Sequence, residues 1–489
     1  MKFLIDTNVL IALEPAAISD LEPGTNAVFE FARRVSESGG QLYIHPAACV
    51  DIERDKNKRR RELRLTVLNR YPSLPDPPAL SPQLEQVLGR AERHSNDWVD
   101  NLLLAALKAD AVDVLVTEDN RIRAKATRLN LDTRVATVAE AVSLVRDLFD
   151  KVPSPPPAVE RVSAHCLDET DPIFESFRPD YPDFDKWLRK CKREQRSALV
   201  IYGDPNTLAA ICIYKHEELP PFGLTGKVLK ICSFKVSGDY NGFRYGELLL
   251  KSVFDYANSN NYDWVFVTAF EKYRNLIVLL EEFGFQSTEE TTSLGELVLT
   301  KPMSFTETER ESLDSLSFNT RYGPSAIKLV GVPTFIVPIR PAYHRLLFPE
   351  GKGQLDLMAG KHPFGNSLRK AYLSNASIRI ITRGSNILFY RSADVRGVTC
   401  LGVVEETMVS SSPDKIAGYV GKRTVYTFRE IVELCAREVL AILFRQARIL
   451  DRPITLEELK QNGVISAAPQ SIGSVPKRAL EWLQTRLDG

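Results

Sequence analysis

The chain has 489 residues, of which 44% are hydrophobic and 26% charged, and its 63 basic residues balance its 63 acidic ones. This composition excludes disordered and fibrous proteins, and a net charge of zero does not indicate a surface that attracts polyanions as a whole. No uninterrupted apolar run approaches the roughly 18 residues that a membrane-spanning helix needs. The seven cysteines are scattered and form no CxxC pair, which favours a reducing cytoplasm over a disulfide framework or a cysteine zinc site.

The length predicts two to four domains, because a typical domain has roughly 100–200 residues. Segment 150–158 is too rich in proline for a helix or a strand interior and is predicted to be a stiff linker. A softer boundary is expected within 302–324, where a polar stretch follows an apolar strand. We therefore expect an α/β multidomain chain, with a parallel-sheet unit over 1–149, an α+β unit over 159–305, and a small β-barrel with helices over 320–489.

In the first unit, predicted strands at 3–5, 41–46 and 112–117 alternate with helices. The amino-terminal run resembles a signal peptide, but Asp6 and Asn8 interrupt it, so it is predicted to be the first strand. Strand–helix alternation favours a parallel sheet, whose ligand crevice lies at the carboxyl ends of the strands. The acidic candidates near those ends are Asp6, Asp51, Glu53, Asp97, Asp100, Glu118 and Asp119.

Such a set of carboxylates suits hydrolysis assisted by a divalent metal. Carboxylate oxygens bind Mg²⁺ or Mn²⁺, and a metal-bound water can attack a phosphodiester. Four motifs occur in order, namely Asp6-Thr-Asn after a strand, an acid behind His45-Pro-Ala-Ala-Cys-Val, Asp100-x-x-Leu-x-Ala-Ala, and Leu-Val-Thr-x-Asp119. This order resembles the PIN-domain nucleases. The resemblance implies a Mg²⁺-dependent endoribonuclease of the toxin or stress-effector type.

The resemblance also implies a role for individual residues. The catalytic and metal-binding acids that it implies are Asp6, Asp51, Asp100 and Asp119. Thr7 and Asn8 would support the first acid. The second acid of the family is usually glutamate, so Glu53 competes with Asp51 for that role.

Residues 53–64 carry seven basic and three acidic side chains in twelve positions. A run of this kind is commonly a solvated helix face, but beside a carboxylate crevice it also suits salt-dependent phosphate contacts. We therefore expect RNA as the substrate of this unit, with Arg59, Arg60 and Arg61 as phosphate-binding residues. The sequence leaves open whether an antitoxin-like protein or a second copy of the chain binds here.

In the second unit, strands are predicted at 199–214, 230–236 and 263–268, and a glycine-bearing turn at 241–246 leads into an amphipathic helix. Free amides at such a helix start favour an anion such as a pyrophosphate. Together with Asn275-x-x-x-x-Leu-x-x-x-Gly-Phe, the turn resembles the GNAT acetyltransferases, which bind acetyl-CoA at this turn. The contacts that the resemblance implies are Val236, Gly242, Phe243, Arg244, Tyr245, Gly246 and, for the CoA arm, Asn275.

This unit departs from the GNAT pattern at two positions. Arg244 occupies the place of the middle glycine, so either the turn is wider or the arginine itself contacts phosphate. Leu280 occupies the place of the tyrosine that commonly protonates the CoA thiolate. Tyr273, Glu281 and Glu282 are candidates to replace it, and the sequence does not choose among them.

The third unit has strand-like runs at 326–330, 335–340, 378–382, 387–392 and 397–405, which predict a small barrel. A helix is expected at 366–374 and an amphipathic helix over 430–444. The run from Gly384 to Glu405 resembles the PUA-like superfamily, particularly its ASCH and EVE branches, and implies RNA binding. The expected groove and phosphate contacts are Arg369, Lys370, Tyr372, Tyr390, Arg391 and Ser392.

Three hypotheses about function follow. The first is a cytoplasmic Mg²⁺-dependent ribonuclease fused to an acetyl-CoA-binding GNAT-like unit and an RNA-binding PUA-like unit. The second is an N-acetyltransferase that acts on a protein or a tRNA-linked amine, with the PIN-like unit as a scaffold. The third is an RNA-binding regulator without enzymatic activity.

Overall fold

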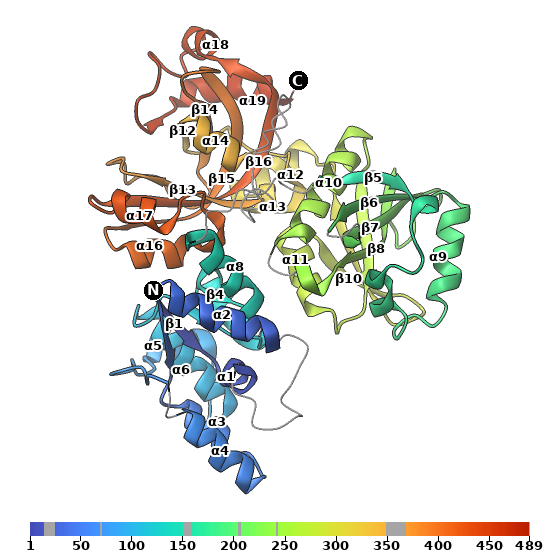
Figure 1. Ribbon diagram of the computed structural model, residues 1–489. Coiled ribbons are helices and arrows are strands. Elements are labelled where there is room, and N and C mark those ends of the chain that lie inside the picture. Colours follow the sequence, from blue (N-terminus) through green and yellow to red (C-terminus); the bar gives the residue numbers. More distant parts are fainter. Residues whose placement is uncertain are drawn as a thin grey trace. The chain divides into compact units, whose positions relative to one another are not determined.

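The computed structural model describes residues 1–13, 25–68, 71–149, 158–203, 207–240, 243–348 and 368–488 (Figure 1). The chain divides into two compact units. Unit 1 contains Met1–Val152 and Val409–Val439, and unit 2 contains Pro153–Met408 and Leu440–Gly489. All but the last residue of the predicted linker at 150–158 lies outside the described residues. Within the described part of the chain, no helix is long and apolar enough to cross a membrane.

Unit 1 is built on the predicted parallel sheet. Its strand order is β2-β1-β3-β4, and each neighbouring pair is parallel. The central strand is fully apolar after its first residue because helices cover both faces, and Phe3 and Leu4 are completely buried. The strands are β1 (Lys2–Ile5), β2 (Gln41–Ile44), β3 (Val114–Val116) and β4 (Val135–Ala136). The helices are α1 (Thr7–Leu13), α2 (Thr25–Glu37), α3 (Ala48–Glu53), α4 (Lys58–Leu68), α5 (Pro82–Leu88), α6 (Asn96–Lys108), α7 (Asn120–Arg128) and α8 (Val138–Phe149).

A distant segment completes unit 1. Residues 409–439, which we expected in the C-terminal unit, form α16 (Pro413–Val420), the short helix η6 (Gly421–Arg423) and α17 (Phe428–Leu434) within unit 1. The amino-terminal ammonium lies 3.2 Å from Asp414, and the rings of Phe149 and Phe428 lie 5.0 Å apart. Gly418 allows close approach, because a Cβ there would lie 2.9 Å from the carbonyl oxygen of Asp113. Side chains more than 260 residues apart in the sequence therefore share one interior.

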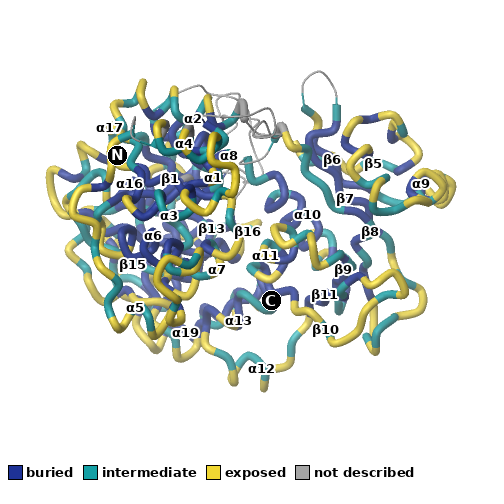
Figure 2. The backbone as a smooth tube through the Cα atoms, turned by 90° about the horizontal axis from the view of Figure 1, so that it is seen from below, coloured by how far each residue is buried: buried dark blue, intermediate teal, exposed yellow. Residues whose placement is uncertain are grey.

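Unit 2 contains the predicted α+β fold, on a sheet with the order β10-β11-β9-β8-β7-β6-β5. Neighbouring strands are antiparallel except β8 and β9, which are parallel. The strands are β5 (Glu160–Ser163), β6 (Ser197–Tyr202), β7 (Leu208–Glu217), β8 (Val228–Val236), β9 (Trp264–Ala269), β10 (Gln286–Thr291) and β11 (Leu297–Pro302). Figure 2 shows the buried residues along β7, which lies next to the central strand β8.

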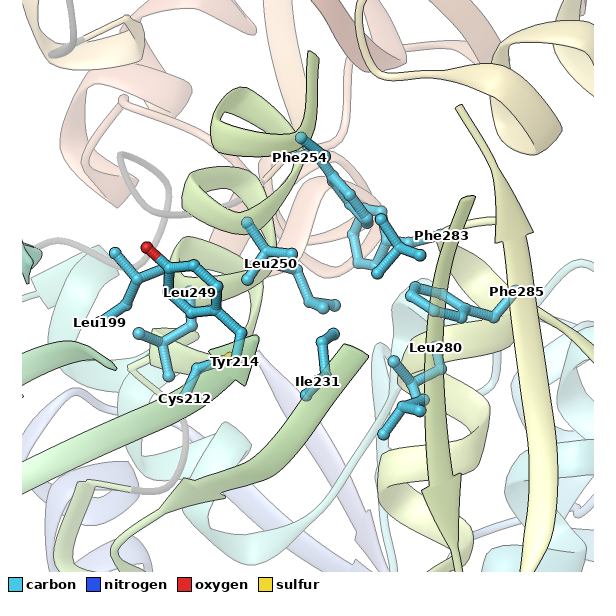
Figure 3. Close-up of a cluster of buried hydrophobic side chains, with 14 of the residues drawn as sticks. Leu199, Cys212, Tyr214, Ile231, Leu249, Leu250, Phe254, Leu280, Phe283 and Phe285 are labelled. Atoms are coloured by element: carbon cyan, nitrogen blue, oxygen red, sulfur yellow. The ribbon is translucent and has the colours of Figure 1, made fainter. Parts of the chain in front are cut away.

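Helices cover both faces of this sheet. On one face, α10 (Tyr245–Ser259) and α11 (Arg274–Glu282) pack against β-strand residues such as Leu199 and Cys212, as Figure 3 shows. On the other face, α9 (Phe184–Arg193) packs against a separate cluster that includes Ile211 and Ile213. Alternate residues of the strands enter the two clusters, as the two-residue period of a strand requires.

A second sheet in unit 2 has the order β13-β16-β15-β14-β12-β17. Its strands are β12 (Thr334–Ile339), β13 (Arg369–Ser374), β14 (Asn386–Arg391), β15 (Gly397–Ser410), β16 (Val439–Thr455) and β17 (Gly473–Ser474). The remaining α-helices among the described residues of unit 2 are α12 (Glu307–Ser312), α13 (Ser315–Tyr322), α14 (Pro341–Leu347), α18 (Leu456–Gln461) and α19 (Leu480–Asp488). We call residues 325–408 and 440–488 the C-terminal sheet domain.

Several predicted elements of this domain are wrong. The predicted helix at 366–374 is strand β13 where it is described, and the predicted helix over 430–444 ends at Leu434 and gives way to strand β16. A short continuous apolar run such as Val439–Phe444 fits a buried helix or a buried strand equally well, so its pattern could not decide. Residues 326–330 and 378–382, expected as strands, have no regular structure.

The boundary expected within 302–324 is a packed junction. Lys301, at the end of β11, is fully buried, and its ammonium donates to the carbonyl oxygen of Arg321 at 2.7 Å. This contact satisfies a carbonyl in the last turn of α13, where a cation is favoured. A Cβ on Gly284 would lie 2.0 Å from the carbonyl oxygen of Thr320, so only glycine fits there.

Candidate active site

The parallel strands β8 and β9 diverge partway along their length. Val228–Ile231 pairs with Trp264–Val267, and the pairing then stops, although β9 stays paired with β11 as far as Ala269. On the other side of β8, Ile213 of β7 faces Ser233 while Tyr214 faces Ile231, which leaves Cys232 as an extra residue. One extra residue is a β-bulge, and a bulge bends its strand. We call the divergence between Cys232–Val236 and Thr268–Ala269 the fork.

The two faces of the fork carry different side chains. Phe234 and Val236 pack on the core beneath α10 and α11. Ser233 and Lys235 instead share a face with their β7 partners Ile213 and Ile211, which belong to the cluster on the α9 side. Before the bulge, Leu229 and Ile231 are the β8 residues on the core side, so the extra residue shifts the alternation of the strand by one position. The predicted contact Val236 thus borders the fork on the side of α10.

The residue before α10 has a left-handed backbone conformation. Arg244 has a φ of 55° and a ψ of 30°, in the left-handed region. A non-glycine residue adopts it at a cost of about 1–2 kcal/mol. Its guanidinium pairs with Glu247 on the first turn of α10. Gly242, also predicted as a contact, lies outside the described residues.

Side chains around the turn fix its position. The rings of Tyr240 and Tyr245 stack with their centroids 5.7 Å apart, and Phe243 packs 5.6 Å from Tyr245. Tyr245 is only 1% exposed, so its predicted contact with a ligand can come from its backbone but not from its hydroxyl. A Cβ on Gly246 would lie 3.1 Å from Leu279 of α11, so the absence of a side chain lets α10 and α11 approach here.

Helix α11 carries the remaining predicted residues. Asn275 is exposed in its first turn, whereas Leu280 is completely buried in the core. Of the candidates to replace the missing tyrosine, Glu282 is bound by Arg369 at 3.2 Å and Glu281 is exposed to solvent. The hydroxyl of Tyr273, just before the helix, donates to Asp180. Neither Glu282 nor Leu280 is therefore available to a CoA thiol.

Unit 1 brings the four predicted acids to one edge of its sheet. Asp6 follows β1 and accepts hydrogen bonds from the Thr117 hydroxyl at 2.7 Å and from the amide of Thr7 at 2.7 Å. Burial raises the pKa of Asp6 from 3.8 to about 6, and the charges of Asp100 and Asp51 add to that rise. The four acids are close enough to interact electrically, because the charge of Asp119 also raises the pKa of Asp100.

Each of the other acids has a protein partner. Asp51 accepts from the hydroxyl of Thr7 at 3.1 Å, and Lys125 lies 3.4 Å from Asp100. Asp119 caps α7 by accepting a hydrogen bond from the amide of Arg121 at 2.7 Å. Burial raises the pKa of Asp119, but the hydrogen bonds from Arg121 outweigh this effect, so the pKa is lowered overall. Among the described residues, no three acidic, histidine or cysteine side chains are spaced to hold a metal ion. The acids do not form a preformed Mg²⁺ or Mn²⁺ site in this arrangement.

The other acidic candidates of unit 1 have structural contacts. Glu118 accepts from the amide of Val138 at 2.8 Å, at the start of α8. Asp97 pairs with Lys125 at 2.9 Å, and Glu53 is exposed at the end of α3. Between Asp51 and Glu53, the structure thus directs Asp51 toward Asp6.

The basic run forms α4 and the turn before it, but its arginines differ. Arg60 binds Asp55 at 2.8 Å, and Arg61 donates to the backbone oxygen of Asp55 at 3.0 Å. Arg59 is exposed to solvent. Two of the three predicted phosphate contacts are thus already engaged with the turn before the helix.

The RNA groove predicted in the C-terminal sheet domain is not formed by the residues named for it. Lys370 of β13 and Tyr390 of β14 are 0% and 2% exposed. Burial lowers the pKa of Lys370 to about 7. Arg369 is held by Glu405 at 2.9 Å and Arg391 by Asp394 at 2.9 Å. The other two, Tyr372 and Ser392, donate to the carbonyl oxygens of Pro338 at 2.8 Å and Ile339 at 3.1 Å.

Sequence reasoning missed several polar residues on the α9 side of the fork. Asp180 and Tyr181 lie between the short helix η4 (Pro172–Phe177) and α9, Glu296 precedes β11, and Lys235 lies on β8. They come from separate parts of the sequence, and none belongs to a motif. The sequence pattern that could have drawn attention to this region is Phe177-x-x-Asp180-Tyr181, which combines two aromatic residues with an acid. By itself this pattern does not predict a binding site.

Residues 164–285 match the model of the acetyltransferase (GNAT) family. They therefore form a GNAT acetyltransferase domain, which contains the fork and the turn before α10. A search of curated proteins gives no match.

Comparison with solved structures finds partial likenesses of two kinds. An ASCH protein from Zymomonas mobilis is 15% identical and covers 31% of this chain and 94% of its own, with a TM-score of 0.25. A GNAT-family acetyltransferase from Staphylococcus aureus is 9% identical and covers 30% of this chain and 100% of its own, with a TM-score of 0.24. At these TM-scores the likenesses carry no argument about function.

Proposed function

We propose that the chain is an N-acetyltransferase that moves the acetyl group of acetyl-CoA to an amine at the fork. The observation that carries this proposal is the divergence of β8 from β9 next to the start of α10, within the GNAT domain. Beyond Ile231, β8 has no strand partner on its β9 side among the described residues. Its free amides and carbonyls can pair with an extended amide chain such as the pantetheine arm, as an added strand would.

The turn before α10 supplies the other half of acetyl-CoA binding. Backbone amides at the start of this 15-residue helix point out of the helix, and the helix dipole favours negative charge there. A pyrophosphate at this end places the thioester toward the fork. Because Arg244 already pairs with Glu247, the backbone carries most of the phosphate recognition.

The reaction balances without a protein nucleophile. The neutral amine attacks the thioester carbonyl, the C–S bond breaks, and the products are an acetamide and CoA, whose thiolate takes up a proton. Leu280 cannot donate that proton, so it comes from solvent or from the Tyr273 hydroxyl. We expect product release to respond to pH more strongly than in enzymes with a tyrosine at that position.

The test is acetyl-CoA binding by calorimetry, with release of free CoA thiol as the activity measurement. We expect Gly246→Val to weaken acetyl-CoA binding by more than about tenfold, since a Cβ at that position already approaches Leu279 at 3.1 Å. Gly473→Val is the matched control, because the nearest atom to a Cβ there is 4.0 Å away, on Ile336. If the wild-type chain does not bind acetyl-CoA, the proposal is wrong.

A second candidate, a metal-dependent ribonuclease in unit 1, is favoured by Asp6. Its carboxyl is buried, and burial raises its pKa to about 6, with a smaller contribution from the negative charges of Asp100 and Asp51. A divalent cation would stabilise the ionised form of this buried carboxyl, but Arg121 and Lys125 would first have to release Asp119 and Asp100. The test is RNA cleavage in Mg²⁺ or Mn²⁺ by the wild type and by Asp6→Asn. Cleavage that persists in Asp6→Asn would exclude this site.

A further inference from the structure

We propose that the acceptor is a primary alkylammonium of the lysine side-chain type, held on the α9 side of the fork by Asp180, Tyr181, Phe270, Tyr273 and Glu296. We call these residues the amine site. The inference rests on the proposed function, because it names the substrate class of the same reaction. Four independent features of the structure support it.

First, the segment 177–181 joins both arms of the fork. On the β8 side, the ammonium of Lys235 lies 6.0 Å from the ring centroid of Phe177. On the β9 side, the ring of Tyr181 lies 5.3 Å from that of Phe270, which directly follows β9. An acetyl group that reaches the fork from the turn of α10 thus faces this segment. The nucleophile must then approach from the α9 side.

Second, two carboxylates in this region are each hydrogen-bonded to a tyrosine. The hydroxyl of Tyr181 donates to Glu296 at 2.7 Å, and Glu296 is only 7% exposed. The hydroxyl of Tyr273 donates to Asp180. Because each tyrosine orients its carboxylate, the remaining oxygen lone pairs are fixed in direction. Carboxylates held next to aromatic rings select a cation over a neutral or an anionic group.

Third, the structure already contains a primary ammonium in this environment. Lys272 pairs with Asp180, and its ammonium lies 5.6 Å from the ring centroid of Phe270 and 5.5 Å from that of Tyr273. The Lys272 side chain is 57% exposed and belongs to the loop between β9 and α11. An exposed lysine side chain exchanges conformations readily, so a substrate ammonium can take its place on Asp180 and the rings.

Fourth, a buried hydroxyl on the same face has no partner. Ser233 is 7% exposed, and its Oγ makes no hydrogen bond within the described residues. It lies one residue past the bulge at Cys232, where β9 has left β8. A buried polar group without a partner is costly, and native proteins retain few of them. A polar atom of the bound amine or of the acetyl carbonyl would satisfy it.

The chemistry requires the ammonium to lose a proton before it attacks. The balanced reaction converts the alkylammonium and acetyl-CoA into the N-alkylacetamide, CoA with its free thiol, and one proton released to solvent. Lys235 is half-buried within range of Asp180, and burial lowers the pKa of its ammonium. Asp180 and Glu296 favour the charged form when the amine binds, whereas the charged form of Lys235 favours the neutral amine, which is the form that reacts.

The test uses the full chain with acetyl-CoA as the donor and compares two acceptors. They are Nα-acetyl-lysine amide and glutamate, whose amine is flanked by carboxylates. We expect acetylation of the lysine derivative and little of glutamate. Asp180→Asn and Glu296→Gln should each raise the KM for the lysine derivative about tenfold or more, since a charge-assisted hydrogen bond is lost. The KM for acetyl-CoA should not change. Tyr181→Phe keeps the ring and should raise the amine KM severalfold, which covers the case in which Glu296→Gln fails to fold.

Lys272→Met gives the sharpest result, because it removes the group that now occupies the site. We expect it to lower the amine KM severalfold, whereas a purely structural Lys272 would leave that KM unchanged or raise it. Glu37→Gln is the control, since Glu37 pairs with Arg33 at 2.7 Å on α2 of unit 1.

Three outcomes overturn the inference. They are acetyl-CoA binding without transfer to Nα-acetyl-lysine amide, a preference for glutamate, and an unchanged or higher amine KM in Lys272→Met. Failure of the wild type to bind acetyl-CoA instead overturns the proposed function itself. The calorimetric measurement therefore separates the two failures.

Discussion

The acid edge of unit 1 and the fork of unit 2 are candidate sites of opposite kinds. At the acid edge, the sequence motif has all four acids, yet protein cations and capping bonds hold the side chains apart from any shared ligand. At the fork, the motif has lost a glycine and a tyrosine, yet the backbone keeps the divergence and the left-handed turn. The geometry of a site formed by the backbone does not depend on the identity of each side chain. The geometry of a site formed by side chains depends on the groups to which those side chains are hydrogen-bonded or paired.

The largest expected effect comes from a substitution at Gly284, the glycine that follows α11. Gly284→Val should destabilise unit 2 by about 4 kcal/mol, because its Cβ would collide with the carbonyl oxygen of Thr320 and its φ is +86°. Gly295→Val is the matched control, since Gly295 has a φ of +80° but nothing within 4 Å of a Cβ. We expect it to cost only about 1 kcal/mol. Equal losses in denaturant titrations would show that the packed junction is unimportant.

The next test concerns the segment that unit 1 takes from residues 409–439. Ile431 of α17 is completely buried, so Ile431→Ala should cost about 3 kcal/mol. The loss should appear in the unfolding transition of unit 1 and leave acetyl-CoA binding unchanged. Val432→Ala, at a neighbouring residue that is 45% exposed, should change stability by less than about 0.5 kcal/mol. A loss confined to unit 2 would contradict the assignment of this segment.

The smallest expected effect is the pH dependence that Asp6 gives to unit 1. The folded pKa of about 6 lies above the ordinary 3.8, so between these values the unfolded chain releases the proton while the folded chain keeps it. Stability therefore falls as the pH rises from about 4 to about 6, by at most about 3 kcal/mol. Asp6→Asn removes this fall. The measurement is the difference in unfolding free energy between the two chains at several pH values.

A difference that stays constant with pH would mean that Asp6 ionises normally, and the electrostatic reason for a cation at the acid edge would disappear. A pH-dependent difference that Mg²⁺ abolishes would instead support the ribonuclease candidate. In either case the fork should be unaffected, since it lies in unit 2. These results would sharpen the contrast between the two sites.

The sequence predicted the features that depend on neighbouring residues. Alternating apolar runs predicted the parallel sheet of unit 1, and acids directly after strands predicted which side chains reach its carboxyl edge. The glycine turn and the following helix predicted the GNAT domain. Each of these rests on the period of a strand or a helix, or on a residue whose position at the end of an element is set locally.

The sequence failed where local pattern and tertiary contact disagree. Lys370 and Arg369 look like solvent-facing cations on a helix, yet both lie on strand β13, where Lys370 is fully buried and Arg369 pairs with Glu405. Val439–Phe444 is apolar at every position, so only its pairing with β13 identifies it as a strand. Nothing in the sequence connects residues 409–439 with Met1 or Phe149, because that packing depends on chain segments far apart.

The sequence by itself determined the strands of the parallel sheet, the order of the acids and the GNAT domain, because these follow from short-range periodicity and from the chemistry of single residues. The tertiary structure alone decided which cations occupy the acids, where the bulge at Cys232 opens the fork, and how Asp180, Tyr181 and Glu296 come to share one face. These features depend on pairing register and on long-range packing. A shift of one residue reverses the face of a strand, and no local pattern specifies such a shift.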